Sequence, residues 1–503
     1  MGTDKLFDLI SRMTRSEKRY FTLSAKKFTD KTSNYLKLFN AINEMEVYDE
    51  QKLIKKAKFI KNLNSEKKYL YETLLDNLRS FNKKKFPKTQ VTEMILDADF
   101  LRRRGLYEQS SRVLQKAKKL AEYHEFHLSL LDINRIERKL QLYVVKKNLA
   151  QSIEALGEEW LETYQLVKEE YEYFDFQNKA GYTRNFDHAK INQDYIANFE
   201  QTFSNTLELE PESINSVRVN FRRFLSIISY FTFKNDEQNQ ISFYAKALSW
   251  MRSTPQVRVI MLESYRIFLI NYLDALTEAS QWSIFPDVVK ELKSLPEEDF
   301  HQEGLASYAL VYYELIYYMN ICDFVEAKKL ANQFDEILEK YQKTVTVSTQ
   351  LAFQINIAIL YFVLEEFKES LKYFKSIVLS SEKENRQDIL RLGRMFKVIL
   401  FHELEDVESF EPRYRSFVRY FRNLPVSCEF ELLVLDHVNK MQKVVKTERK
   451  PILVSLQKAL LLLRDKNIKV TIAGLEEVLI WIISRITNQP IAKILRDQNN
   501  SKN

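Results

Sequence analysis

One short pattern of residues recurs along this chain and restricts its fold more than any other feature of the sequence. An apolar or aromatic residue is followed by a bend, then by a small residue and further apolar positions, in segments 101–110, 318–327 and 361–370. This order is typical of a helix–turn–helix unit that stacks on similar units, because each unit buries its apolar face only against its neighbours. The pattern therefore predicts an all-α fold, an α-solenoid of stacked helix pairs.

The use of glycine supports the same fold class. The chain of 503 residues contains 7 glycines and 9 prolines, whereas an average glycine content of about 7% would give roughly 35. Glycine supplies the positive φ angles of tight hairpins, phosphate-binding loops and strained active-site turns. Its scarcity argues against β-rich folds, nucleotide-binding α/β folds and most enzyme scaffolds.

Three regions are predicted along the chain: a basic helical N-terminal region over 1–88, helical repeats over 89–426 and a C-terminal helical cap over 427–503. In the first region, Thr14 and Glu17 have the spacing of a capping box at a helix N-terminus. Helices over 91–104, 107–123 and 126–145 begin the repeats, and helix pairs of roughly 35–45 residues follow over 232–439. Residues 175–190 lack a clear apolar period, so an irregular joint is expected there.

The segment 361–377 resembles the tetratricopeptide repeat in register. Its small and aromatic residues stand where that family packs one helix closely against the next, at Ala358, Tyr361, Phe367, Ser370 and Phe374. Units at 318–331 and 98–117 are similar, although Cys322 and Glu365 replace the family's glycine at the bend. The segment 413–417 and the apolar helix around Trp481 also look like uncharacterised helical-repeat proteins of Bacteroidota, which would make this a bacterial protein.

The tetratricopeptide resemblance implies a non-enzymatic scaffold that binds a peptide or protein partner on its concave face. First helices line the inner face in that family, so Tyr318 and Tyr361 are predicted to contact the partner. One subclass of the family grips a C-terminal carboxylate with Lys, Asn and Arg side chains. Only Asn356 matches that set here, so it is kept as a candidate partner-binding residue and the carboxylate grip is not inferred.

The charge is unevenly placed, which suggests an alternative function. Residues 1–120 hold 28 Lys and Arg against 15 Asp and Glu, a balance of +13, whereas the rest of the chain carries −6. Clustered cations can neutralise phosphates in a salt-dependent, sequence-tolerant way. The alternative is therefore a nucleic-acid-binding or regulatory protein that uses 1–120. The candidate polyanion-binding residues are Lys55, Lys56, Lys83, Lys84, Lys85, Arg102, Arg103 and Arg104.

No catalytic residue, cofactor site or metal site is predicted. His124 and His127, with Glu122 and Glu125 nearby, could supply metal ligands, but no further ligand lies at a closing spacing, and a solvated helix end is preferred. Adjacent carboxylates such as Glu365 and Glu366 are interpreted as a solvated helix face.

The sequence also suggests where the protein resides. Two cysteines far apart, with neither a signal-peptide pattern nor a long apolar stretch, favour a cytoplasmic protein that does not enter the membrane and whose thiols are buried. The oligomeric state is left open.

Overall fold

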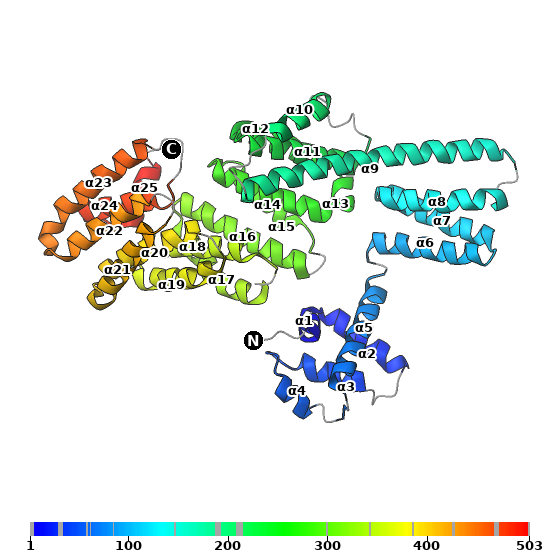
Figure 1. The fold of residues 1–503 in the computed structure, drawn as a ribbon, viewed down its shortest axis with the longest axis horizontal. Coiled ribbons are helices and arrows are strands. Elements are labelled where there is room, and N and C mark those ends of the chain that lie inside the picture. Colours follow the sequence, from blue (N-terminus) through cyan, green and yellow to red (C-terminus); the bar gives the residue numbers. More distant parts are fainter. Residues whose placement is uncertain are drawn as a thin grey trace. The chain divides into compact units, whose positions relative to one another are not determined.

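The computed structural model describes residues 5–28, 34–56, 59–60, 62–83, 85–144, 147–186, 193–207, 215–297, 300–341, 344–384, 387–424, 428–466 and 472–500. Within these ranges the chain forms 25 α-helices and one short 3₁₀-helix, and no β-strand (Figure 1). The predicted all-α class is confirmed. Consecutive helices pack on one another, as a helical repeat requires. The chain divides into two compact units, residues 1–265 and 266–503.

The helices of the first unit, up to the boundary within α14, are α1 (Lys5–Arg12), α2 (Arg15–Phe28), α3 (Asn34–Asn43), α4 (Glu50–Lys56), α5 (Leu63–Asn82), α6 (Pro87–Arg103), α7 (Tyr107–Tyr123), α8 (His127–Val144), α9 (Leu149–Phe186), α10 (Gln193–Leu207), α11 (Val217–Phe233), α12 (Glu237–Ser253), α13 (Gln256–Ile260) and α14 (Leu262–Glu278).

The second unit continues with α15 (Phe285–Ser294), α16 (Phe300–Asn320), α17 (Phe324–Tyr341), α18 (Val347–Val363), α19 (Phe367–Glu384), α20 (Gln387–Glu403), α21 (Val407–Arg422), α22 (Glu429–Gln442), the 3₁₀-helix at Lys446–Glu448, α23 (Arg449–Lys466), α24 (Leu475–Thr487) and α25 (Ile491–Asn500).

Helices α1–α5 surround a core of their own, in which Phe21 and Phe39 pack with ring centroids 4.7 Å apart. The capping box that opens α2 is confirmed. The Thr14 backbone N–H donates to Glu17 Oε2 at 2.8 Å, and the Glu17 N–H donates to Thr14 Oγ1 at 3.2 Å. Both backbone donors are thereby satisfied at the helix N-terminus.

The predicted repeat pair at 91–123 is present as α6 and α7. Helix α7 has the predicted bounds, whereas α6 begins earlier, at Pro87, because proline is well suited to the first helical turn. Ser110 donates from Oγ to the Ala98 carbonyl at 2.7 Å, and Ser370 donates to the Ala358 carbonyl at 2.8 Å. The small residues predicted at these positions therefore make the same interhelical hydrogen bond in two units that lie far apart in sequence.

The same bend connects many of these helices. A residue with positive φ ends the turn, and the next N–H donates to the carbonyl five residues earlier, which is the Schellman arrangement. Among the described residues this bend occurs at Gly105, Glu125, Asn235, Ser280, Cys322, Glu365, Glu405 and Asn488.

The bends also give the length of the repeat. From Asn235 to Glu405 they follow at intervals of 45, 42, 43 and 40 residues, which agrees with the predicted helix pairs of 35–45 residues. These intervals are longer than the 34 residues of a tetratricopeptide repeat.

The predicted irregular joint at 175–190 is wrong through residue 186, and residues 187–192 lie outside the described ranges. Helix α9 runs for 38 residues, from Leu149 to Phe186, beside α8 and α11 (Figure 1). Its C-terminal half is held by burial, since Tyr173, Phe176 and Ala180 form a core with Phe199 of α10 and Tyr230 of α11. These partners come from later in the chain. Packing against them stabilises the helix although the apolar residues of this segment have no clear helical spacing in the sequence.

The C-terminal helices of the second unit pack over the bends of earlier helix pairs. Arg485 of α24 binds Glu403 through two hydrogen bonds of 2.9 Å and Glu365 through one of 2.6 Å. Arg496 of α25 donates to the Cys322 carbonyl at 3.4 Å. Glu365 was predicted to lie on a solvated helix face. It instead forms a bend and an ion pair, because Arg485, 120 residues later, supplies the opposite charge.

Two further features hold this C-terminal region in place. The fully buried Trp481 donates from Nε1 to Glu403 at 2.7 Å. Gly474 opens α24 with a φ of +84°, and a Cβ there would stand 2.3 Å from Leu392 Cδ1. Only glycine fits this position, because it tolerates both the backbone conformation and the close approach.

The two cysteines are buried free thiols, and burial raises the pKa of each.

Candidate functional site

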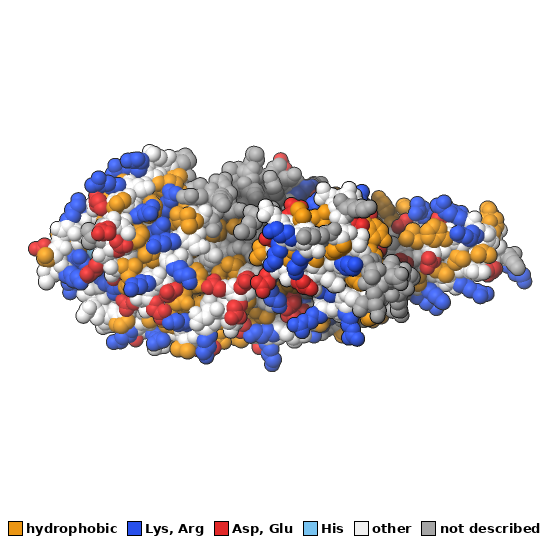
Figure 2. All heavy atoms as spheres, turned by 90° about the horizontal axis from the view of Figure 1, so that it is seen from below, with side chains coloured by type: hydrophobic (Ala, Val, Ile, Leu, Met, Phe, Trp, Pro, Cys, Tyr) orange, Lys and Arg blue, Asp and Glu red, His pale blue; other side chains and the backbone are white. Residues whose placement is uncertain are grey.

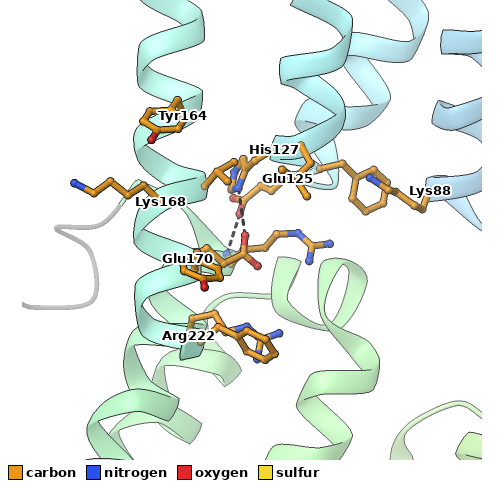
Figure 3. A pocket seen from close by; sticks show the side chains of 13 residues that line it. Lys88, Glu125, His127, Tyr164, Lys168, Glu170 and Arg222 are labelled. Carbon is orange, nitrogen blue, oxygen red and sulfur yellow. Dashed lines mark hydrogen bonds and ion pairs between the residues drawn. The ribbon is translucent and has the colours of Figure 1, made fainter. Parts of the chain in front are cut away.

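A pocket of about 750 Å³ lies in the first unit, where the start of α8, the middle of α9 and the start of α11 meet. Lys88 of α6 completes its wall (Figure 3). The lining residues fall into a polar group, Lys88, Glu125, His127, Lys168, Glu170, Arg218 and Arg222, and an apolar group, Phe126, Leu128, Tyr164, Val167, Tyr171 and Phe174. The volume, and the combination of large apolar side chains with a set of polar groups, are typical of ligand pockets.

The bend between α7 and α8 carries Glu125 toward the start of α11. Glu125 has a φ of +49°, which reverses the chain so that its carboxylate reaches a segment about 90 residues later. Its two oxygens accept hydrogen bonds from Ser216 Oγ and from the Val217 and Arg218 N–H groups, at 2.8–2.9 Å. A carboxylate at a helix N-terminus satisfies free N–H groups and opposes the positive end of the helix dipole. Glu125 is therefore committed to holding α11 in place.

Two cations of the pocket lie close to the Phe126 ring. Lys88 Nζ lies 5.0 Å and the Arg218 guanidinium 5.3 Å from its ring centroid. The His124 ring stacks on Phe126 with centroids 5.3 Å apart. Burial, reinforced by the charge of Arg218, lowers the pKa of both Lys88 and His124.

Arg218 is fixed by the protein itself. It donates from Nε to the His124 carbonyl at 3.1 Å, from Nη2 to the Ile260 carbonyl at 3.2 Å, and from Nη1 toward Met261 Sδ at 3.3 Å. These contacts tie α11 to the α7–α8 bend and to α13. Burial lowers the pKa of this guanidinium, although Glu170 and Glu125 oppose the shift.

His127 and Glu170 form the polar centre of the pocket (Figure 3). His127 Nδ1 lies 3.6 Å from Glu170 Oε2, and the histidine is only 6% exposed. Burial on its own would raise the pKa of Glu170. The His127 imidazole, together with Arg218 and Arg222, holds this pKa below its usual value. The buried His127 and the half-buried Glu170 thus form a polar pair whose carboxylate stays ionised.

One face of α9 brings large side chains to the pocket. Tyr164, Val167, Tyr171 and Phe174 follow at spacings of three or four residues, which places them on one side of the helix. Tyr171 is 65% exposed and Phe174 41%. The face continues along α9 with Trp160, which stacks on Tyr164 at a centroid separation of 5.2 Å. We call Trp160, Tyr164, Tyr171 and Phe174 the aromatic face of α9.

The predicted partner-binding residues lie in the second unit. Tyr318 is half-buried and lines a groove of about 710 Å³ between α16 and α17, where burial and the nearby Glu314 raise its pKa. Asn356 donates from its amide to the Ala352 carbonyl at 2.9 Å within α18. Tyr361 is 6% exposed, and its hydroxyl donates to Asn332 at 3.2 Å. Of the three, only Tyr318 lines this groove, and their binding role stays a prediction.

Among the predicted polyanion-binding residues, most described cations already have partners. Lys56 pairs with Glu44 at 2.9 Å, and Lys83 pairs with Glu93. Lys85 lies over the Phe86 ring, and Lys55 is exposed. Lys84 lies outside the described residues.

The arginines at the end of α6 have partners as well. Arg102 and Arg103 both bind Asp99, at 2.8 and 2.7 Å, and Arg104 donates to the Phe100 carbonyl at 3.1 Å. On the face drawn in Figure 2, the described Lys and Arg side chains are interspersed with acidic and hydrophobic ones.

The preferred interpretation of His124 and His127 as a solvated helix end is wrong. His124 follows the last residue of α7 and His127 is the first residue of α8, and both are buried. The Glu125 bend lies between the two histidines, and each is buried in the fold instead of facing solvent. No group of three or more potential metal ligands occurs in the described part of the chain. The sequence named these histidines and Glu125 but gave no sign of Arg218, Arg222 or the aromatic face of α9.

Comparison with protein-family models gave no match, and no curated protein proved similar to this chain. The fold defines the class of protein as all-helical, with consecutive helices packed in the manner of a helical repeat. Within the described ranges, none of the helices combines the length and the apolar character needed to span a bilayer.

Proposed function

We propose that this chain is a non-enzymatic, cytoplasmic scaffold of the α-solenoid type, resembling tetratricopeptide-repeat proteins, that binds a peptide segment of a protein partner. The bends that recur every 40–45 residues support the repeat assignment. The pocket between α8, α9 and α11 is the docking site that the geometry favours, rather than a surface around Tyr318, Asn356 and Tyr361.

The observation that carries this proposal is the aromatic face of α9 beside an open pocket. Tyr171 and Leu128 are 65% and 64% exposed, although both are large apolar side chains on the rim of a pocket. Contiguous exposed apolar surface bordered by polar groups commonly marks a protein-interaction site. Tyrosine and tryptophan are also the residues that carry most binding energy at interfaces.

The polar groups of the pocket favour binding over catalysis. Glu125 is used to hold the N-terminus of α11, and Arg218 is bonded to two carbonyls and a thioether. The described lining contains neither a serine nor a cysteine that could act as a nucleophile beside His127. These groups shape a rigid wall against which a partner segment can pack.

Display of random 12-residue peptides against the full-length chain tests the proposal. We expect the display to enrich peptides that bind the wild type. Their affinity for the Leu128→Ala and Tyr171→Ala variants should be about tenfold lower, since truncating an interface anchor costs more than about 1 kcal/mol. Leu462→Ala is a matched control, because Leu462 of α23 is also a helical leucine that is 64% exposed. If no enriched peptide depends on Leu128 or Tyr171, the pocket is not a peptide-docking site.

The polyanion alternative has less support, because Asp99, Glu44 and Glu93 already neutralise several of its cations. It is tested by titrating the full-length chain with single-stranded DNA and with RNA at several salt concentrations. Reversing Lys83, Lys84 and Lys85 to glutamate should weaken binding and flatten its salt dependence if the alternative holds. The absence of salt-dependent binding would eliminate it.

A further inference from the structure

Arg222 differs from Lys88 and Arg218 in having no hydrogen-bond acceptor for its N–H groups among the described residues. Its Nε is buried without a hydrogen-bond partner. The guanidinium lies over the Phe174 ring, 4.8 Å from the centroid. Burial lowers its pKa, and Glu170 opposes that shift. A guanidinium has five N–H donors, and leaving a buried donor unpaired costs free energy.

Two of the other three cations of the pocket already have hydrogen-bond acceptors, and the third, Lys168, points elsewhere. Arg218 is bonded to the His124 and Ile260 carbonyls, and Lys88 donates to Ser129 Oγ at 2.6 Å. Lys168 lies 3.9 Å from Glu172 and points away from His127 and Glu170 in Figure 3. Arg222 is therefore the pocket cation best placed to bind an incoming group.

The acidic residues of the pocket do not satisfy Arg222. Both oxygens of Glu125 accept hydrogen bonds from the start of α11. Glu170 lies between His127 and Arg222 in Figure 3, and it approaches His127 Nδ1 to 3.6 Å without a direct bond to Arg222. Four basic and two acidic side chains line the pocket, so its charge is complementary to an anion.

We infer that Arg222 binds a side-chain carboxylate of the docked segment, so that the partner presents Asp or Glu beside its large apolar residues. This inference rests on the proposed function. The planar guanidinium pairs with a carboxylate through two parallel hydrogen bonds, and stacking on Phe174 holds its plane in one orientation. The apolar residues of the segment pack on Tyr164 and Tyr171, which flank the same site.

The experiment is the same 12-residue peptide display, carried out in parallel on the full-length wild type, Arg222→Gln, Arg222→Lys and Arg413→Gln. For the wild type we expect Asp or Glu next to aromatic or large aliphatic residues in the enriched peptides. Replacing that acid by its amide should weaken a selected peptide about tenfold, the effect of losing one charge-assisted pair. Arg222→Gln should bind the acid and amide forms equally.

Two variants provide controls. Arg222→Lys keeps the positive charge and the aliphatic part of the side chain over Phe174 but loses the planar guanidinium that can donate two parallel hydrogen bonds. Part of the preference for an acid should therefore remain. Arg413 of α21 is exposed and outside the pocket, so Arg413→Gln should behave as the wild type. Thermal melts of each variant verify that it is folded.

The outcomes separate the two proposals. Two results would overturn the role of Arg222 and leave the docking site in place. In the first, peptides depend on Tyr171 but show no preference for an acid; in the second, Arg222→Gln and Arg222→Lys show the same preference as the wild type. A display without any peptide that depends on Leu128 or Tyr171 overturns the docking site and this inference with it. Selection of phosphorylated over carboxylate peptides in a follow-up array would overturn the assignment to Asp and Glu.

Discussion

His402 should make the second unit lose stability in mild acid. This histidine lies near the end of α20, is 6% exposed, and its Nδ1 has no hydrogen-bond partner. Burial lowers its pKa from 6.5 to about 4, and the charges of Arg449 and Arg485 add to the shift, while Glu403 and Glu405 oppose it. The imidazole is therefore neutral in the folded state at neutral pH.

The size of the effect follows from these two pKa values. Because the folded-state pKa is the lower one, the unfolded chain binds the proton first as the pH falls below 6.5, and stability is lost from there down toward pH 4. Between pH 7.5 and pH 5 this single group removes about 2 kcal/mol from the free energy of unfolding, with one pKa unit worth 1.36 kcal/mol.

The measurement compares wild type with His402→Leu, which removes the titrating group at similar volume. Unfolding in urea at pH 7.5 and pH 5 is monitored through the hydrogen exchange of peptides from α20. A local probe is needed because the two units need not unfold together. The wild type should lose about 2 kcal/mol more than the variant over this range. Parallel losses in the two proteins would refute the assignment of this shift to His402.

Three further changes have defined expected results. Glu125→Ala should raise the hydrogen-exchange rates of the Val217 and Arg218 amides and lower the free energy of unfolding by about 2 kcal/mol, because the N-terminus of α11 loses its acceptor. The control Glu122→Ala, at an exposed position nearby, should change neither quantity. Glu403→Gln should reduce the stability of the second unit by about 2 kcal/mol in urea unfolding, because Arg485 loses the carboxylate that accepts two of its hydrogen bonds and keeps only Glu365. Equal stability of Glu403→Gln and of Glu408→Gln, a control at an exposed position, would contradict this reasoning. Ser280→Gly should raise the melting temperature, with a gain of about 0.5 kcal/mol, because glycine adopts the positive φ of 53° without steric cost; Ser280→Ala should show no gain.

The local sequence predicted those features of the fold that depend on near neighbours. The capping box at Thr14 and Glu17 and the bounds of α7 are local, since each depends on residues within one helix. The bends predicted at Cys322 and Glu365 are confirmed, but the repeat resemblance located them and the local residue types did not. Gly105 is the expected residue at a positive φ, whereas Cys322 and Glu365 adopt the same conformation with side chains that usually avoid it.

The candidate site could not be predicted, because it is assembled from distant segments. Glu125 reaches Ser216 across 91 positions, and α11, which carries Arg218 and Arg222, packs on α9 from later in the chain. In the sequence, the aromatic face of α9 has the spacing of an ordinary buried helix face. Only its exposure in the fold distinguishes it from a core.

Arg485 and Arg496 also determine how many repeats the second unit can hold. Their contacts with Glu365, Glu403 and Cys322 span 120, 82 and 174 positions of the chain. In a simple array each repeat contacts only its neighbours, so repeats can be gained or lost during evolution one at a time. Here the loss or gain of a helix pair between Cys322 and Glu403 would leave one of the two arginines opposite the wrong bend. A change in repeat number within this span would therefore also require changes in the C-terminal helices that carry these arginines.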